Sequence, residues 1–397
     1  MMISRRNFLA VAGAAAAAAA LTACGGSSSS TSTASSTASS AASEAGSEAA
    51  SKITKVALTC DTGTIDDESF NQACWSAVSS YMGDDCQYYI PEADASDEDR
   101  ETMIRQAVND GAEVIVCVGY LYGASLAWAA EQYPDVKFIA IDVTQGDIGT
   151  DEIPSNCYCI TFKEEQAGYL AGYAIAKDGK TKLGFLGGMA VPAVVRYGYG
   201  FVQGVDAAAA DLGLTDVSLN YVYGGQFFGD ADITAVMDTW YAGGTEVVFA
   251  CGGGIYTSAV DAAKKVGAKV IGVDVDQAGV IAGYAGVEGM TVTSAMKGLY
   301  PTTYDTLTDV IVNGNWDAYK GKIATLGLVS GEDPELNYVQ IPMGEGTQWS
   351  DSFTQDDYKA MVKDMFDGKI TVSNDVSKTP SDFATVIAVE DQGAIKG

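Results

Sequence analysis

The chain has 397 residues, a formal net charge of −29 and no histidine. Nucleic acid is excluded as a partner, because its phosphates would be repelled by such an acidic chain. Without histidine, Ser-His-Asp triads and histidine-held metal sites are excluded too, so we expect no metal and no cofactor.

Residues 1–23 have the order of a secretory signal. Arg5 and Arg6 precede a short apolar stretch rich in alanine, and small residues lead up to Cys24. The stretch is shorter than the ~20 residues that a helix needs to cross a membrane, which predicts a removable signal rather than a span. The arginine pair fits a twin-arginine export signal and an ordinary signal equally well.

The segment Leu21–Cys24 resembles the bacterial lipobox, in which the cysteine is acylated after cleavage. This resemblance implies a lipid anchor at Cys24 on the outer face of the cell membrane. Residues 24–52 are otherwise mostly Gly, Ser, Thr and Ala, a composition with too little apolar surface to fold. We therefore expect a flexible tether between the anchor and the folded part.

Seven further cysteines follow Cys24. Their odd number argues against a complete disulfide framework, and several lie in apolar runs where a thiol behaves as a small buried hydrophobe. The expected export would permit a disulfide, so the sequence leaves open whether one forms.

From Ile53 onward, short β-branched or aromatic runs alternate with longer helical patterns. The predicted strands are 55–60, 87–90, 113–118, 136–142, 157–162, 183–186, 217–222, 246–250, 269–273 and 291–295. Continuous apolar strands separated by amphipathic helices are typical of parallel sheets covered on both faces. The sequence therefore predicts an α/β protein.

The folded part, roughly 345 residues, exceeds the size at which one hydrophobic core usually keeps growing. We therefore predict two doubly wound lobes joined by a hinge and divide the chain near Phe162. The first lobe is expected to comprise residues 53–162 and about 292–325. The second is expected to comprise residues 163–291 and about 326–397.

Ligands of open α/β sheets bind beyond the carboxyl ends of the strands, so the residues that follow the strands are the candidates for function. They form a set of acids, amides, aromatics and bare backbone. The predicted ligand-binding residues are Asp61, Phe70, Asn71, Tyr120, Phe227, Gly253, Asp274 and Lys297. Such a set suits a small polar molecule.

These residue types have separate uses. Asp61 and Asp274 can accept charge-assisted hydrogen bonds from hydroxyl or amine groups. Phe70 and Phe227 can hold a flat ring, since aromatic pairs add about 0.5–1.5 kcal/mol beyond burial of area. Lys297 can donate to a hydroxyl oxygen.

Simpler roles are open for several neighbours. Asp66 and Asp67 are expected to cap a helix rather than to bind a ligand. The run Gly252–Gly254 would let a ligand approach the backbone, although it lacks the spacing of a phosphate loop. Either phenylalanine of the pair Phe227–Phe228 could belong to the core.

Residues 56–72 resemble the opening of the basic membrane protein family, which includes PnrA-like purine nucleoside receptors. Residues 271–277 and 293–297 resemble two later motifs of that family. The resemblance extends from Ile53 to the C-terminal region. It implies a type I periplasmic-binding-protein fold that supplies nucleosides to the permease of an ABC transporter.

The resemblance also implies roles for individual residues. Phe70 matches the first aromatic face on the base and Phe227 the second, although the adjacent phenylalanine is an alternative. Asp61 matches an acid that reads the polar edge of the base. Asp274 and Lys297 match groups that hold the ribose hydroxyls, and a glycine of the triple-glycine run offers backbone.

The leading hypothesis is a monomeric binding protein that captures a purine nucleoside between two lobes and passes it to a permease. A surface lipoprotein that binds another small molecule, such as a sugar or vitamin, for uptake or signalling is a second hypothesis. A third is an exported nucleosidase or glycosidase that uses two carboxylates such as Asp61 and Asp274.

Overall fold

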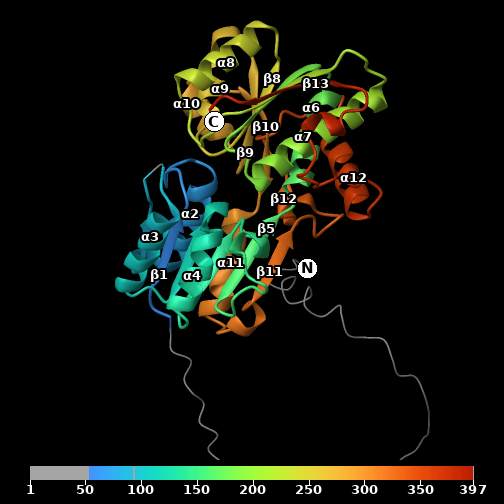
Figure 1. The fold of residues 1–397 in the computed structure, drawn as a ribbon. Coiled ribbons are helices and arrows are strands. Elements are labelled where there is room, and N and C mark those ends of the chain that lie inside the picture. The colour runs from blue at the N-terminus through green and yellow to red at the C-terminus, as the bar shows by residue number, and fades with distance from the viewer. Residues whose placement is uncertain (1–52, 93, 397) are drawn as a thin grey trace, which may run out of the picture. The chain divides into compact units, whose positions relative to one another are not determined.

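The computed structural model describes residues 53–92 and 94–396 (Figure 1). The predicted signal at 1–23, the expected acylation site Cys24 and the expected tether to residue 52 lie outside the described residues. Within the described part the chain forms two sheets.

The first sheet has six strands, all paired in parallel, in the order β11-β5-β4-β3-β1-β2. Its strands are β1 (Val56–Cys60), β2 (Cys86–Tyr89), β3 (Val114–Val118), β4 (Lys137–Ile141), β5 (Cys157–Phe162) and β11 (Lys322–Leu326). Strands β1, β3 and β5 are buried along their whole length, as expected of a sheet covered on both faces.

Alternate residues of these strands pack against different helices. Val56 and Leu58 of β1 face the layer formed by α2 (Phe70–Met82) and α11 (Leu299–Ile311). Ala57 between them joins the apolar cluster of the opposite layer. The helices of that layer are α3 (Asp97–Asn109) and α4 (Gly123–Gln132), and the short α5 (Gln145–Ile148) lies beside α4.

The second sheet has seven strands in the order β12-β10-β9-β8-β6-β7-β13, and only the β10–β12 pair is antiparallel. Its strands are β6 (Lys182–Gly187), β7 (Ser218–Tyr223), β8 (Val247–Cys251), β9 (Lys269–Asp274), β10 (Thr291–Lys297), β12 (Val339–Gln340) and β13 (Ala388–Ala394).

Helices cover both faces of this sheet as well. The helices packed on one face are α6 (Glu164–Lys177) and α7 (Pro192–Leu212), and α12 (Gln355–Phe366) joins the same cluster. Those on the other face are α8 (Ala231–Ala242), α9 (Tyr256–Val266) and α10 (Ala278–Ala285). The predicted α/β architecture with parallel sheets is thus confirmed.

One boundary differs from the sequence-based division. The strand Thr291–Lys297 pairs with β9 in the second sheet, whereas residues from about 292 were expected in the first lobe. The chain returns to the first sheet only afterwards, through α11 and β11. The register beside β9, with Met296 opposite Asp274, keeps β10 in the second sheet up to its last residues.

Three further observations concern residues 53–92 and 94–396 alone. No helix there is long and apolar enough to cross a membrane. No group of acidic or cysteine side chains there is arranged to hold a metal ion. The seven cysteines in this part are free thiols.

Candidate ligand-binding site

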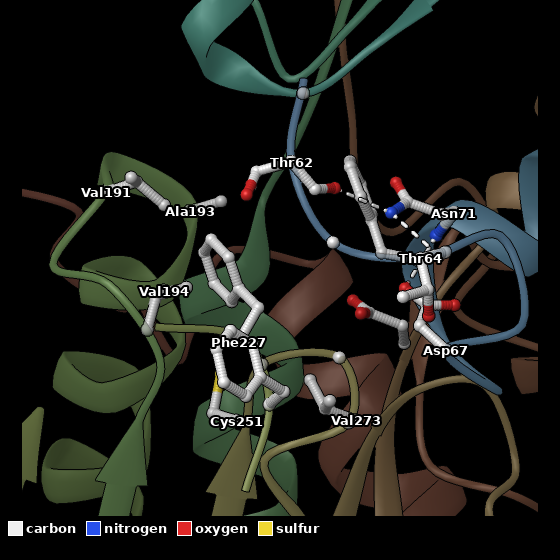
Figure 2. A pocket seen from close by; sticks show the side chains of 18 of the residues that line it. Thr62, Thr64, Asp67, Asn71, Val191, Ala193, Val194, Phe227, Cys251 and Val273 are labelled. Atoms are coloured by element: carbon white, nitrogen blue, oxygen red, sulfur yellow. Dashed lines mark hydrogen bonds between the residues drawn. The ribbon is translucent and has the colours of Figure 1, made fainter. Parts of the chain in front are cut away.

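A cavity of about 360 Å³ lies where the carboxyl ends of strands from both sheets meet (Figure 2). All eight residues predicted to bind a ligand line this one cavity. They are Asp61, Phe70, Asn71, Tyr120, Phe227, Gly253, Asp274 and Lys297. Their assembly from segments more than 200 residues apart follows from the parallel strands, whose carboxyl ends share one edge of each sheet.

Asp61 directly follows β1 and is 7% exposed. Its Oδ2 accepts a hydrogen bond from the backbone N–H of Leu121 at 2.9 Å, and Arg100 donates to its carbonyl at 3.1 Å. Burial raises the pKa of Asp61 to about 7, although the hydrogen bond from Leu121 and the charge of Arg100 oppose the shift. The carboxyl group can therefore change its protonation near neutral pH.

Gly119, at the end of β3, makes room for this carboxyl group. A Cβ atom at residue 119 would lie 2.1 Å from Cγ of Asp61, and the backbone φ of Gly119 is +115°. Both facts require glycine here, because a side chain would displace the carboxyl group and strain the backbone. Tyr120 follows immediately and lines the cavity.

The loop between β1 and α2 is held by its own side chains (Figure 2). The amide nitrogen of Asn71 donates to the carbonyls of Thr62 and Thr64 at 2.9 and 3.1 Å. Asp67 accepts from the backbone N–H groups of Asn71, Ser69 and Gln72 at 3.0 Å each, which confirms its predicted role at the start of the helix. This capping fixes where Phe70 begins α2.

Lys297, the last residue of β10, lies among three carboxylates. Its Nζ is 2.6 Å from Oδ2 of Asp142, 3.5 Å from Oε1 of Glu164 and 3.8 Å from Oδ1 of Asp274. It also lies 4.5 Å from the centre of the Phe70 ring, a cation–π distance. Burial alone would lower the pKa of Lys297, but these carboxylates raise it above its usual value.

Asp274 ends β9 and links the two sheets. Its Oδ2 accepts from the hydroxyl of Ser69, in the first-sheet loop, at 2.8 Å, and its Oδ1 accepts from Tyr197 at 3.4 Å. Its φ of +66° is unusual for a residue other than glycine. Burial raises the pKa of Asp274, and the charge of Lys297 opposes this shift.

Sequence reasoning missed two of the acids in this cluster. Asp142 directly follows β4, and Glu164 begins α6 shortly after β5. Both lie at or just after the ends of predicted strands, as Asp61 and Tyr120 do, so their position at strand ends is the signal in the sequence that points to them. Glu164 is fully buried and accepts from Nε of Arg196 at 2.7 Å. Burial raises its pKa, while Arg196 and Lys297 oppose the shift.

Phe227 follows β7 and lies in the cavity opposite the Asp67–Asn71 side of the first loop (Figure 2). A Cβ atom at Gly188 would lie 2.4 Å from the ring of Phe227, so the ring can take this position only because residue 188 has no side chain. Its carbonyl accepts from Gly254 N–H at 2.9 Å. Phe228 also reaches the cavity lining but is 50% exposed, which favours Phe227 as the aromatic wall.

A family model described as "ABC transporter substrate-binding protein PnrA-like" matches residues 53–332. The chain belongs to this family. The matched residues include all eight predicted site residues, whereas the C-terminal segment from residue 333 lies outside the match.

Known proteins agree with this family assignment. The ABC transporter nucleoside-binding protein BmpA of Lactococcus lactis is 27% identical over 338 residues, which is 80% of this chain and 88% of the relative. Basic membrane protein A of Borreliella burgdorferi is 31% identical over 57% of this chain and 65% of its own length. The predicted resemblance to the basic membrane protein family is therefore confirmed.

A solved structure supports the fold. The solute-binding protein of an ABC transporter system from Aeropyrum pernix K1 has a TM-score of 0.61 and 23% identity, and the match covers 83% of this chain and 90% of that one. At this identity the likeness shows the fold alone. It confirms the predicted solute-binding-protein fold.

Charge defines what this family member's cavity can accept. Among the described residues that line it, five are aspartates, and Lys297 is the basic one. Two buried acceptor atoms, Oδ1 of Asp142 and Oδ1 of Asn71, have no hydrogen-bond partner within the described part of the chain. Buried acceptors need donors, so the lining favours a ligand rich in hydroxyl or amine groups and disfavours an anion.

Proposed function

We propose that this substrate-binding protein captures a purine nucleoside in the cavity between its two sheets. The observation that supports the proposal most strongly is the joint placement of Phe70, Phe227, Asp61, Asp274 and Lys297 around one cavity of about 360 Å³. The Lactococcus lactis relative is named as a nucleoside-binding protein, which agrees with this choice of ligand.

The chemistry of a nucleoside matches the two kinds of lining. Its base is a flat ring that can lie against Phe70 and Phe227, and base–aromatic stacking contributes about 1–3 kcal/mol per base. Its ribose carries hydroxyl donors for Asp274 and the unpartnered oxygen of Asp142. The edge of the base carries polar groups that Asp61 can bind.

We further propose that each sheet with its helices forms one lobe and that the lobes close over the ligand. Ser69 and Asp274, in different lobes by this division, already share a hydrogen bond of 2.8 Å. Closure is then favoured by the contacts that the ligand makes to both sides.

Delivery and anchoring belong to the same proposal. The ligand passes to the permease of an ABC transporter. The protein acts as a monomer, and acylated Cys24 with its tether holds it on the outer face of the cell membrane. Binding without chemical conversion distinguishes this role from that of an exported hydrolase with paired carboxylates.

Identification of the co-purified ligand tests the proposal. The protein is purified without added nucleoside and unfolded, and the released small molecules are identified by mass spectrometry. We expect an intact purine nucleoside in near-stoichiometric amount. The refolded protein, incubated with that nucleoside, should leave it intact. Release of free base over time would indicate a hydrolase, and release of a sugar or vitamin instead would contradict the choice of ligand.

A further inference from the structure

The C-terminal segment adds the strand β13 to the second sheet (Figure 1). Beyond that strand it reaches the loop that carries Phe227. Strand β13 lies parallel to β7 at the edge of that sheet. Beyond it, the backbone N–H of Ile395 donates to the carbonyl of Tyr223, the last residue of β7, at 2.8 Å. Lys396 therefore lies beside the start of the Phe227 loop.

The side chain of Lys396 bridges the two residues that flank the segment 227–229. Its ammonium group donates to Oε1 of Gln226 at 3.2 Å and pairs with the carboxylate of Asp230. The amide nitrogen of Gln226 in turn donates to Oδ2 of Asp230 and to the carbonyl of Phe228, at 2.9 Å each. The ammonium thus sets which way the Gln226 amide faces.

Asp230 also bonds to the helices α8 and α9 that cover the sheet. Its Oδ1 accepts from the N–H of Ile233 at 3.0 Å and caps α8, and its own N–H donates to Ser258 at 2.9 Å. The loop is thus held at Asp230 by α8 and α9, and at Phe227 by Gly254. Lys396 contacts both Gln226, the first residue of the loop, and Asp230, its last.

The backbone approaches closely at the same place. A Cβ atom at Gly225 would lie 2.6 Å from the carbonyl oxygen of Lys396, and the φ of Gly225 is +81°. The loop and the C-terminal segment are therefore in contact through their backbones at Gly225 as well as through the ion pair of Lys396.

Contacts upstream hold the segment in place independently of Lys396. The buried carboxylate of Asp206 on α7 accepts from the backbone N–H groups of Thr385, Val386 and Ile387 at 2.7, 2.8 and 3.2 Å. Nε1 of Trp240 on α8 donates to Oε1 of Gln392 on β13 at 3.2 Å. Loss of the Lys396 ammonium therefore leaves β13 attached.

We propose that Lys396 is a positioning residue for the ligand-binding aromatic Phe227, which it holds through Gln226 and Asp230. This inference rests on the proposed function for its effect on affinity, but not for its effect on the loop. It assigns a role in ligand binding to a segment outside the residues matched by the family model.

Three variants test the proposal. Lys396→Met keeps the length of the side chain and removes its charge, and Lys396→Arg restores the charge. Lys265→Met is the matched control. Lys265 on α9 forms a surface ion pair with Asp238 on α8, at 2.8 Å, and both helices cover the second sheet.

Hydrogen exchange of the ligand-free protein gives the first readout. With Lys396→Met we expect faster exchange of the N–H groups of Asp230 and Gly254, with β1 unchanged, and we expect wild-type rates for Lys396→Arg and Lys265→Met. Unchanged exchange at both amides in Lys396→Met would overturn the proposal. This readout decides the matter even if the wild-type protein binds no nucleoside.

Titration with guanosine gives the second readout. Lys396→Met should weaken binding about fivefold, Lys396→Arg should restore it, and Lys265→Met should have no effect. In a Phe227→Ala background, Lys396→Met should cause no further loss, because the residue that it positions is absent. An equal fivefold loss in that background would show that Lys396 acts elsewhere and would overturn the proposal.

Discussion

The two phenylalanines of the Phe227–Phe228 pair have different surroundings at the residue scale. Phe227 packs over the bare backbone of Gly188, whereas Phe228 is half exposed. We expect Phe227→Ala and Phe70→Ala each to weaken purine nucleoside binding by about 1–3 kcal/mol, about five- to 160-fold, without unfolding the protein. Phe228→Ala is the control, with a loss below about threefold. Equal losses in a guanosine titration for Phe227→Ala and Phe228→Ala would contradict this assignment.

Asp61 makes stability depend on pH. The pKa of Asp61 is about 7 in the folded chain, compared with 3.8 for an ordinary aspartate such as that of the unfolded chain. The folded protein therefore binds the proton of this carboxyl group more tightly than the unfolded chain does. The stabilisation that follows is complete below pH 4 and is lost as the pH rises through 7. Asp61→Asn removes this dependence, so its Tm relative to wild type should rise by about 2 °C or more between pH 5 and pH 8.

Thermal melts at the two pH values measure this effect. The exposed Asp135 provides the control, and Asp135→Asn should give the same difference from wild type at both. A Tm difference for Asp61→Asn that stays constant with pH would show that the carboxyl group does not titrate in this range.

At the scale of elements, the end of β3 sets the geometry of the site. Gly119→Ala would place a methyl group 2.1 Å from the Asp61 carboxyl carbon at a positive φ, so we expect a loss of about 1–3 kcal/mol in the free energy of unfolding. Guanosine affinity should fall as well, because the carboxyl group must move.

Gly149 supplies the matched control for this substitution. It also has a positive φ, +73°, but a Cβ atom there would meet nothing within 4 Å. Gly149→Ala should therefore show only the backbone strain of about 1 kcal/mol and full guanosine affinity. Chemical denaturation and titration of both variants measure the difference. Full affinity in Gly119→Ala would contradict the role given to the β3 end.

The elements that sequence reasoning found are those with a clear apolar pattern. Strands β1, β3 and β5 are buried throughout, and each produced a continuous hydrophobic run. Strands β11 and β13 are largely exposed, so they carry no such run and were not predicted. The position of β10 depended on pairing with β9, which local pattern does not encode.

The candidate site shows the same division. Asp61, Asp274 and Lys297 were predictable because they lie at strand ends and in motifs that resemble a known family. The contact of Lys396 with Gln226 was not, because it joins residues 170 apart and depends on β13 lying beside β7. Long-range pairing of this kind is a property of the topology rather than of any local sequence.

At the scale of the whole molecule, the proposed mechanism requires closure of the two sheets on the ligand. Guanosine should therefore reduce the radius of gyration measured by small-angle X-ray scattering, because a ligand that contacts both sides favours the closed state. Phe70→Ala with Phe227→Ala in one chain provides the control and should show no change at the same guanosine concentration. A wild-type radius that does not respond to saturating guanosine would contradict closure.

The most direct test of nucleoside capture is calorimetric titration of the fragment from Ser51 to Gly397. It should first be freed of bound ligand by unfolding and refolding, and then titrated with guanosine, inosine, adenosine, cytidine and ribose. We predict tight binding of purine nucleosides, weaker binding of cytidine and little heat with ribose. A folded sample that gives no heat with any purine nucleoside would contradict the account and would point to another ligand in the same cavity.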